Sequence, residues 1–421
     1  MNKTPSKKSP GCDEMSTGLL SVDDAKQRIL KNIFPVLGHE KLAIRSALNR
    51  VLAEDIQSTI NVPPYDNSAM DGYALNSADL PASGHTSLDL VGESFAGRPY
   101  IGSLECGQAI RIMTGAVIPD GADTIIMQEQ VKREGDSITI QTGHKKGDHV
   151  RCIGEDMRVG QTILKRGQMI TPSELGLLSS LGLAEISVIR KIRVAFFSTG
   201  DELKSVGETL EEGQIYDSNR YTLYGMLTRL GVDIIDMGVI KDRREDVRQA
   251  FTDAANIADA VLTSGGVSVG DADYVKEMLE ELGQVNFWRV AMKPGKPLAI
   301  GKINQAAFFG VPGNPVSAMA TFYQFVQPAL QKLMGMNPSF KTLLKVPCMT
   351  TLKKAPGRLE YQRGILDYNE EGELSVQTTG VQGSHILTSM SRANCFIILE
   401  ADCNGVAVGD KVTVQPFAGI I

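Results

Sequence analysis

The chain has 421 residues, of which 42% are hydrophobic and 22% are charged, a composition ordinary for a folded globular protein. Its 49 acidic residues outnumber its 43 lysines and arginines, and the resulting net charge of −6 argues against a nucleic-acid-binding protein, which usually presents a basic face. No segment approaches the roughly 20 apolar residues that cross a bilayer, and the six scattered cysteines form no CxxC pair, so we expect a cytoplasmic protein with reduced thiols.

The first 190 residues predict a flexible N-terminal extension over 1–17 and a mixed region over 18–190. Apolar residues at helical spacing follow Ser21, a candidate N-cap, and a second helical stretch covers about 43–53. Two prolines at 63 and 64 then interrupt regular structure. Short strand-like runs between turn signals predict a β-rich insertion over about 62–150, followed by a helix and a strand up to 190.

Residues 191–338 alternate apolar strand-like runs with amphipathic helical patterns. The strand-like runs begin near Arg193, Val232, Ala258 and Ala306. This alternation predicts a doubly wound, mostly parallel α/β sheet that helices cover on both faces. Residues 339–421 return to strands and turns and predict a small C-terminal β domain. The whole is therefore a multidomain α/β plus β protein.

Three of the predicted strands end in glycine- or proline-rich turns, at residues 198–202, 263–270 and 311–317. Ligands of open α/β sheets bind beyond the carboxyl ends of the strands, and glycines allow the backbone to approach an anion. One such turn is as well explained by a tight strand-to-helix connection, but three at one sheet edge predict a binding site. Neither GxxxxGK[ST] nor GxGxxG is present, which argues against a P-loop kinase or an NAD enzyme.

Acidic residues follow the same strand ends. Glu202 follows the first turn, Asp242 follows the next predicted strand, and Asp273 opens the helix after the second glycine turn. Mg²⁺ prefers oxygen ligands and typically takes one or two carboxylates together with waters and substrate phosphates, so these side chains predict a magnesium site. Each of them, taken alone, is better explained as a helix cap or a partner of the helix dipole.

Two further segments are predicted to form walls of a cleft. Lys293 and Lys296 lie in Lys-Pro-Gly-Lys-Pro, where the two prolines make the chain extended and rigid, so the segment predicts an anion clamp rather than a solvated loop. The polar turn at 66–72, which contains Asp71, is either an Asx-type turn or a second wall contributed by another domain or subunit.

Together, these segments resemble the MoeA family of molybdopterin molybdenumtransferases, and also the C-terminal domain of gephyrin-type proteins. The resemblance covers about residues 16–421. It rests on seven motifs in the family's order: Asn67–Ala74, Arg111–Gly115, Gly154–Asp156, Ser198–Glu202, Thr263–Asp271, Lys293–Pro297 and Pro312–Ser317.

The resemblance implies an enzyme that inserts molybdate into the dithiolene of adenylylated molybdopterin with Mg²⁺ and releases AMP. It also implies an elongated homodimer with the active cleft between subunits, a C-terminal β-barrel, and an upstream molybdopterin adenylyltransferase as a partner. Neither a membrane nor a nucleic acid is an expected partner.

The same resemblance implies roles for individual residues. The catalytic set is Asp71, Asp156, Glu202, Asp242 and Asp273, of which Glu202, Asp242 and Asp273 bind the metal. Molybdate is expected near Arg363 and Ser384. The full binding set is Thr114, Arg151, Ser264, Gly265, Gly266, Lys293, Lys296, Pro312, Pro315, Ser317, Arg363 and Ser384. Arg289 stands where some relatives carry lysine, so it is assigned no role.

Two other functions remain open from the sequence. A non-catalytic scaffold of the same fold would bind a partner peptide at the dimer interface, as gephyrin-type proteins do. A generic Mg²⁺-dependent phosphotransferase is disfavoured by the missing P-loop motif.

Overall fold

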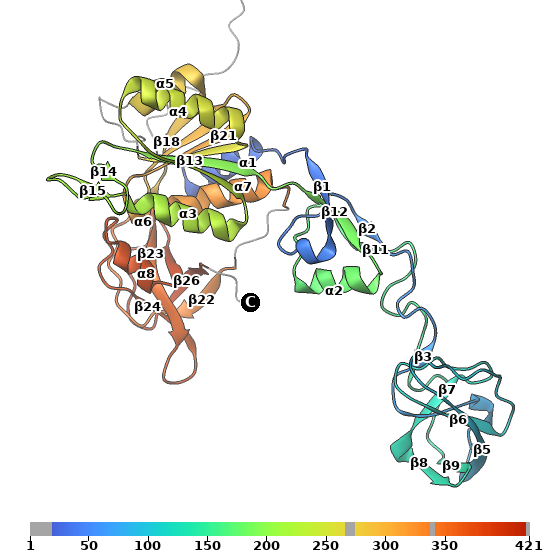
Figure 1. Cartoon of the computed structure of the whole chain (residues 1–421). Coiled ribbons are helices and arrows are strands. Elements are labelled where there is room, and N and C mark those ends of the chain that lie inside the picture. The colour runs from blue at the N-terminus through green and yellow to red at the C-terminus, as the bar shows by residue number, and fades with distance from the viewer. Residues whose placement is uncertain (1–18, 266–273, 337–341, 418–421) are drawn as a thin grey trace, which may run out of the picture. The chain divides into compact units, whose positions relative to one another are not determined.

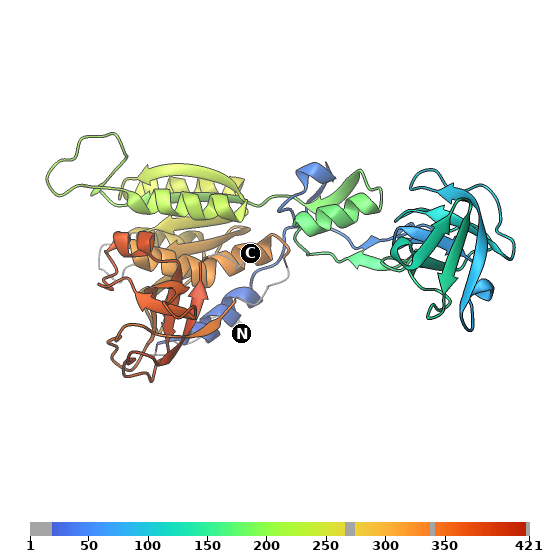
Figure 2. The same cartoon turned by 90° about the horizontal axis from the view of Figure 1, so that it is seen from below.

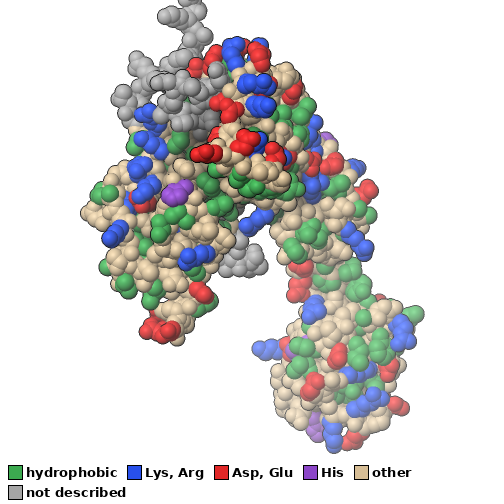
Figure 3. Space-filling view, turned by 60° about the vertical axis from the view of Figure 1, so that its left-hand side comes forward, with side chains coloured by type: hydrophobic (Ala, Val, Ile, Leu, Met, Phe, Trp, Pro, Cys, Tyr) green, Lys and Arg blue, Asp and Glu red, His purple; other side chains and the backbone are tan. Residues whose placement is uncertain are grey.

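The computed structural model of the protein describes residues 19–265, 274–336 and 342–417. Their contacts define two compact units: a large unit, made of the residues up to His39 and those from Ile189 onward, and a small unit, Glu40–Val188. Figure 1 shows the elements of both. On the face drawn in Figure 3, basic and acidic side chains are interspersed. No helix in the described ranges combines the length and apolar character needed to span a membrane.

The large unit is built around a six-stranded sheet. In spatial order its strands are β16 (Asp233–Ile240), β13 (Arg193–Thr199), β17 (Ala260–Ser264), β21 (Ala306–Val311), β20 (Pro297–Ile303) and β18 (Gly283–Arg289). The first four run parallel, which confirms the predicted mostly parallel sheet. The last two are antiparallel to their neighbours, because a tight turn at Asn304, rather than a helix, joins β20 to β21.

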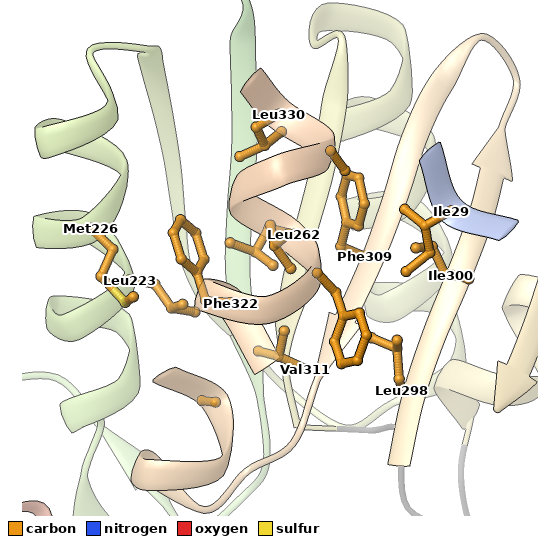
Figure 4. Close-up of a cluster of buried hydrophobic side chains, with 14 of the residues drawn as sticks. Ile29, Leu223, Met226, Leu262, Leu298, Ile300, Phe309, Val311, Phe322 and Leu330 are labelled. Carbon is orange, nitrogen blue, oxygen red and sulfur yellow. The ribbon is translucent and has the colours of Figure 1, made fainter. Parts of the chain in front are cut away.

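Helices cover both faces of this sheet (Figure 1, Figure 2). On one face lie α1 (Val22–Lys31), α3 (Ser218–Leu230), α6 (Pro315–Thr321) and α7 (Gln327–Leu333), and on the other lie α4 (Arg244–Ile257) and α5 (Tyr274–Leu282). Figure 4 shows part of the first apolar layer, in which Leu223 of α3, Leu262 of β17 and Phe322 are buried together. Each face of the sheet therefore has its own core, as a parallel sheet requires.

Two helices show how the sequence sets their ends. The Asp217 carboxylate accepts the Arg220 N–H at 3.0 Å and caps α3, and Gly231 ends that helix with a φ of 78°. After Pro315, one π-helical turn, Phe322–Val326, separates α6 from α7. Between β13 and α3 the chain also forms a short parallel pair, β14 (Leu203–Lys204) and β15 (Ile215–Tyr216).

A second six-stranded sheet forms the C-terminal part of the large unit. Its strands are β19 (Met292–Lys293), β23 (Leu359–Tyr368), β25 (Cys395–Leu399), β26 (Lys411–Pro416) and β22 (Leu344–Pro347) in spatial order, with β24 (Leu374–Thr378) paired to β23 and helix α8 (Leu387–Arg392) beside them. A parallel bridge between Cys348 and Val376 links the segment after β22 to β24. Strand β19 lies before β20 in the chain, so the α/β part contributes a strand to the C-terminal sheet. Closure of this sheet into a barrel stays a prediction.

The small unit contains a third six-stranded sheet and a group of shorter elements. The sheet consists of β7 (Thr124–Met127), β4 (Gly72–Leu75), β6 (Gln108–Ile112), β5 (His85–Ser94), β9 (Ser137–Gln141) and β8 (Val131–Glu134) in spatial order, with 3₁₀ turns at Ser77–Asp79 and Gln128–Gln130. It accounts for the predicted β-rich insertion. The shorter elements are helix α2 (Pro172–Ser180), the 3₁₀ turn Ile44–Ser46, and the strand pairs β1 (His39–Ala43) with β12 (Glu185–Ile189), β2 (Ile56–Gln57) with β11 (Thr162–Leu164), and β3 (Asn67–Ser68) with β10 (Val150–Arg151).

The prediction of a helix over about 43–53 is wrong. Beyond the 3₁₀ turn, Val51 and Leu52 form bridges to Met169 and Val188, so this segment is extended rather than helical. Cross-strand pairing and burial of Leu52 override its weak helical periodicity. The two contact units also divide the chain differently from the predicted segments 1–17, 18–190, 191–338 and 339–421, because α1 packs in the large unit. Those segment boundaries stay predictions.

Candidate functional site

The three glycine- and proline-rich turns follow neighbouring parallel strands. Ser198 of β13 is the register partner of Ser264 of β17, and Ser264 is the partner of Val311 of β21. The turns therefore leave the sheet at one edge, as the sequence predicts. Gly265 has a φ of 88°, and a Cβ there would lie 2.8 Å from the Thr199 carbonyl oxygen, so only glycine fits without strain. Gly266 lies outside the described residues.

Asn219, in the first turn of α3, connects two of these strand ends. Its Nδ2 donates to Ser264 Oγ at 2.8 Å and to the Gly313 carbonyl oxygen at 2.6 Å. Four buried oxygens at these strand ends and at the start of α3 find no hydrogen-bond partner in the part of the chain that the structure describes: Ser198 Oγ, Asp217 Oδ2, Asn219 Oδ1 and Thr263 Oγ1. Buried polar atoms are almost always satisfied. A polar ligand at this edge, offering N–H or O–H donors, would pair with them.

The sequence pattern gave no functional role to Asp217 and Asn219. Asp217 is the N-cap of α3, and this role accounts for only one of its two carboxylate oxygens. Its exposed fraction of 2% is low for a carboxylate, but burial of this kind is not visible in a helix-start pattern.

The carboxylates at the adjoining strand ends lie close together. Asp201 and Glu202 follow β13, and Asp242 follows β16, whose residue Ile240 is the register partner of Thr199. The Asp242 backbone N–H donates to Asp201 Oδ1 at 3.3 Å. Partial burial, together with repulsion from Asp201 and Glu202, raises the pKa of Asp242. Asp273 lies outside the described residues.

These carboxylates could supply some of the ligands of a Mg²⁺ ion but not its complete coordination shell. Within the described ranges, no three His, Cys, Asp or Glu side chains are arranged to hold a metal ion. Mg²⁺ commonly uses one or two carboxylates and takes its other ligands from water and phosphate. Partial burial and the negative charges of Asp201 and Glu202 raise the pKa of Asp242, and a bound cation would offset that repulsion. Metal binding by Asp242 and Glu202 stays a prediction.

The lysine loop, residues 293–297, lies between β19 and β20. Its middle is buried, because Gly295, with a φ of 102°, packs so closely on α6 that a Cβ would lie 2.8 Å from Thr321 Oγ1. Both lysines are exposed. Lys293 Nζ forms an ion pair with Glu360 Oε1 of β23 at 2.9 Å, whereas the Lys296 ammonium has no partner among the described residues.

Arg363 of β23 is the largest fully buried side chain of the described structure, with an exposed fraction of 1%. It donates from Nε to Ser389 Oγ and from Nη2 to the Gly383 carbonyl oxygen, both at 3.0 Å. Burial lowers the pKa of Arg363 to about 10, and no carboxylate in the described ranges offsets this. A buried charge without a counter-ion is costly. The guanidinium is therefore suited to bind an anion.

Ser384 follows Gly383 and is tied to the start of α6. The Val316 N–H donates to the Ser384 carbonyl oxygen at 3.1 Å. Pro315 occupies the first position of α6, and Ser317, in the same turn, is buried. Arg363, Ser384 and Ser317 are thereby linked in one region of the large unit, and their role as an anion site stays a prediction.

The remaining predicted site residues belong to the small unit. Thr114 donates its backbone N–H and its hydroxyl to Asp71 Oδ1, at 2.8 and 2.7 Å, and these hydrogen bonds lower the pKa of Asp71. Arg151 lies on β10 opposite Asn67, and the Asp156 N–H donates to the Val62 carbonyl oxygen. Asp71 and Thr114 are thus neighbours. The predicted meeting of all these residues with the large-unit site in one pocket stays a prediction.

Comparison with known proteins shows which family the chain belongs to. Three family models match: MoeA N-terminal region (domain I and II) at 20–182, probable molybdopterin binding domain at 195–332, and MoeA C-terminal region (domain IV) at 345–417. A molybdopterin molybdenumtransferase of Haemophilus influenzae is 47% identical, over 95% of this chain and 99% of that protein. The chain belongs to the MoeA family. The predicted family is therefore confirmed.

Other MoeA relatives agree along nearly the whole chain. A molybdopterin molybdenumtransferase of Nostoc is 34% identical over 94% of both chains. The crystal structure of a molybdopterin biosynthesis MoeA protein from Pyrococcus horikoshii is 30% identical, with a TM-score of 0.82, and the match covers 95% of this chain and 100% of that one. The mixed α/β, multidomain architecture is thus the architecture of a MoeA protein. The relatives that establish the family are transferases by name, the enzyme class that the sequence predicts.

Proposed function

We propose that the protein is a molybdopterin molybdenumtransferase that acts in molybdenum cofactor biosynthesis. In the proposed reaction, the two dithiolene thiols of adenylylated molybdopterin bond to molybdenum and displace one molybdate oxygen as water. A water molecule cleaves the phosphoanhydride, so that AMP leaves and the terminal phosphate stays on molybdopterin. The observation that carries the proposal is the buried Arg363 guanidinium, which has no counter-ion among the described residues and is hydrogen-bonded to the segment that contains Ser384. A tetrahedral oxyanion such as molybdate would provide that counter-ion.

The site offers separate places for the parts of the substrate. Buried polar oxygens at the ends of β13 and β17 accept hydrogen bonds and suit a heterocycle that carries N–H donors. The lysine loop and Arg363 supply positive charge for molybdate and phosphate. By resemblance we also assign Ser264, Gly265, Gly266, Pro312, Pro315 and Ser317 to the binding of these groups. By the same resemblance, we assign Asp71, Thr114, Arg151 and Asp156 of the small unit a part in the reaction.

Mg²⁺ is proposed as the cofactor, held by Asp242 and Glu202 and, by resemblance, by Asp273. When bound, it would neutralise the phosphoanhydride and the charge that develops on departing AMP. The chain's own residues orient the substrate around it. Positively charged and N–H groups hold the oxyanion and the terminal phosphate in place, so no nucleophilic side chain is required.

The proposal includes assembly and location. We propose a cytoplasmic homodimer with its active cleft between subunits, a barrel-like C-terminal domain, and transfer of substrate from a molybdopterin adenylyltransferase. The three family matches support domain boundaries near those predicted from the sequence. Light scattering during size-exclusion chromatography tests the dimer.

The reaction itself is tested with purified protein, adenylylated molybdopterin, molybdate and Mg²⁺. We expect AMP release, followed by chromatography, and a product that activates a cofactor-free molybdoenzyme. Arg363→Ala should abolish both, while Lys345→Ala, which removes an exposed lysine from β22, should leave both unchanged. Absence of AMP release from the unaltered protein would overturn the proposal and favour the scaffold alternative.

A further inference from the structure

The end of strand β24 gives Arg363 an unusual hydrogen-bond partner. Strand β24 pairs with β23 up to Thr378, which lies opposite Gly364. The next residue, Thr379, donates its backbone N–H to the Arg363 carbonyl oxygen at 3.1 Å. The Arg363 N–H does not complete the ladder, because it donates to Oε1 of the Gln382 side chain at 2.7 Å. A side-chain amide thus takes the place of a strand carbonyl.

The Gln382 amide contacts the Arg363 backbone with both of its ends. Its Nε2 donates to the Arg363 carbonyl oxygen at 3.1 Å, so the amide exchanges two hydrogen bonds with that residue, as a strand neighbour would. Nε2 also lies 2.9 Å from Thr378 Oγ1 and 3.2 Å from the Gly380 carbonyl oxygen, either of which accepts its second hydrogen. The amide orientation is determined, because only its carbonyl end accepts an N–H.

The segment that carries Gln382 also contacts the Arg363 side chain. We call residues 379–389 the arginine loop. Within it, the Gly383 carbonyl oxygen accepts from Nη2 of the guanidinium and Ser389 Oγ accepts from Nε, both at 3.0 Å. In the described part of the chain these bonds use two of the five guanidinium N–H donors. The arginine loop therefore fixes both the backbone and the side chain of one residue and leaves donors for an oxyanion.

The arginine loop also carries Ser384, whose carbonyl oxygen accepts the Val316 N–H of α6. The spacing between Arg363 and Ser384 is thus set by the hydrogen bonds on either side of Ser384. A site that binds one ion through several groups loses affinity when one group moves by about 1 Å. The simpler explanation is that Gln382 only ends β24, in which case its loss would lower stability and leave anion affinity unchanged.

We propose that Gln382 is a positioning residue of the oxyanion site. Its amide keeps the Arg363 backbone in register with the arginine loop and thereby fixes the guanidinium relative to Ser384. Gln382 acts through Arg363 and is assigned no contact with substrate. The inference rests on the proposed function for the anion that is bound, whereas the attachment of Gln382 to the Arg363 backbone is a property of the fold alone.

The attachment is tested by native-state hydrogen exchange of the substrate-free protein, resolved to single amides by mass spectrometry. Gln382→Met keeps the side-chain length and removes both hydrogen bonds, while Gln382→Glu keeps an acceptor for the Arg363 N–H. We expect Gln382→Met to accelerate exchange of the Arg363 amide about fivefold or more, and Gln382→Glu to leave it within about twofold. Gln377→Met, at an exposed position of β24, is the control. Unchanged exchange in Gln382→Met would overturn the attachment.

The effect on the oxyanion is tested by steady-state kinetics with molybdate as the varied substrate. We expect Gln382→Met to raise the KM for molybdate about tenfold, because the guanidinium is displaced, and to leave the KM for adenylylated molybdopterin within about twofold. A variant that is only less folded loses kcat and keeps both KM values. Gln382→Glu, which keeps one of the two hydrogen bonds, should raise the KM for molybdate about threefold. Gln377→Met should match the unaltered protein.

The outcomes separate this inference from the proposed function. An unaltered protein without transferase activity overturns the proposed function and the role in anion binding, and exchange of the Arg363 amide still decides the attachment. An active protein in which Gln382→Met lowers kcat but not the affinity for molybdate overturns the positioning role and leaves the proposed function intact. If Gln382→Met does not fold, an unchanged KM for molybdate in Gln382→Glu overturns the role instead.

Discussion

Arg363 donates its Nε–H to Ser389 Oγ at 3.0 Å, and Ser389 in turn donates to the Ile386 carbonyl oxygen. Ser389 is itself 3% exposed, so the buried guanidinium is oriented by a buried hydroxyl from helix α8. The orientation of Arg363 is therefore set by a residue outside the predicted site.

We expect Ser389→Ala to destabilise the protein by about 1.5–3 kcal/mol, because it removes a hydrogen bond from a buried charged group. The measurement is the free energy of unfolding in urea. Thr388→Ala, at the exposed neighbouring position of α8, is the control and should change it by less than about 0.5 kcal/mol. Equal effects of the two variants would mean that Ser389 does not support Arg363.

Asn219→Ala should also be costly, because Ser264 Oγ and the Gly313 carbonyl oxygen both lose their donor. We expect a loss of about 1–3 kcal/mol in unfolding free energy, together with reduced transferase activity. The exposed Asn256→Ala is the matched control. An Asn219 variant with full stability and full activity contradicts its role in joining the strand ends.

Two glycine substitutions should act in opposite directions. Gly265→Ala places a methyl group 2.8 Å from the Thr199 carbonyl oxygen at a positive φ, and should cost about 1–3 kcal/mol or more. Gly225→Ala lies within α3, where a Cβ meets nothing within 4 Å, and should stabilise by about 0.5–1 kcal/mol. Thermal unfolding of the two variants measures both effects. The same sign for both would contradict the described backbone of the glycine turn.

The raised pKa of Asp242 predicts that the free energy of unfolding depends on pH. Its pKa is raised above the ordinary value of 3.8, so the native state keeps the proton to a higher pH than the unfolded chain does. Stability contributed by the protonated form is therefore lost as pH rises through the native pKa. Asp242→Asn should stabilise the metal-free protein at neutral pH, by less than about 1 kcal/mol because the group is partly exposed.

The advantage of Asp242→Asn should vanish below the ordinary aspartate pKa of 3.8, where the carboxyl is protonated in both states. Urea unfolding across this pH range measures the difference, with the exposed Asp402→Asn as the control. Mg²⁺ should stabilise the unaltered protein more than the Asp242 variant. A pH-independent difference would contradict the repulsion among the three carboxylates.

The sequence predicts the α/β part well because its information is local. Apolar runs such as Val194–Phe197 and caps such as Asp217 and Gly231 are readable one segment at a time, and parallel strands bring their ends to one edge. The segment after Ile44 is predicted poorly, because its extended form depends on bridges to residues more than a hundred positions away. Long-range pairing of this kind leaves no periodic signal.

The same distinction holds for the site. The glycine turns and the lysine loop can be recognised in the sequence by their composition. Glu360 and Ser389 cannot, because they look like ordinary strand and helix residues. Their importance comes from burial beside a lysine and an arginine that lie 67 and 26 positions away in the chain. Only the folded chain shows which partner each one meets.

Strand β19 couples the unfolding of the two parts of the large unit. It precedes β20 without an intervening helix, yet its register partners, Leu359 and Glu360, are in the C-terminal sheet. Unfolding of the C-terminal sheet would remove the strand that pairs with Met292 and Lys293. The lysine loop would then lose its anchor. The two parts of the large unit are thus expected to melt together as one cooperative block, and deleting the C-terminal residues should damage the α/β site rather than merely shorten the protein.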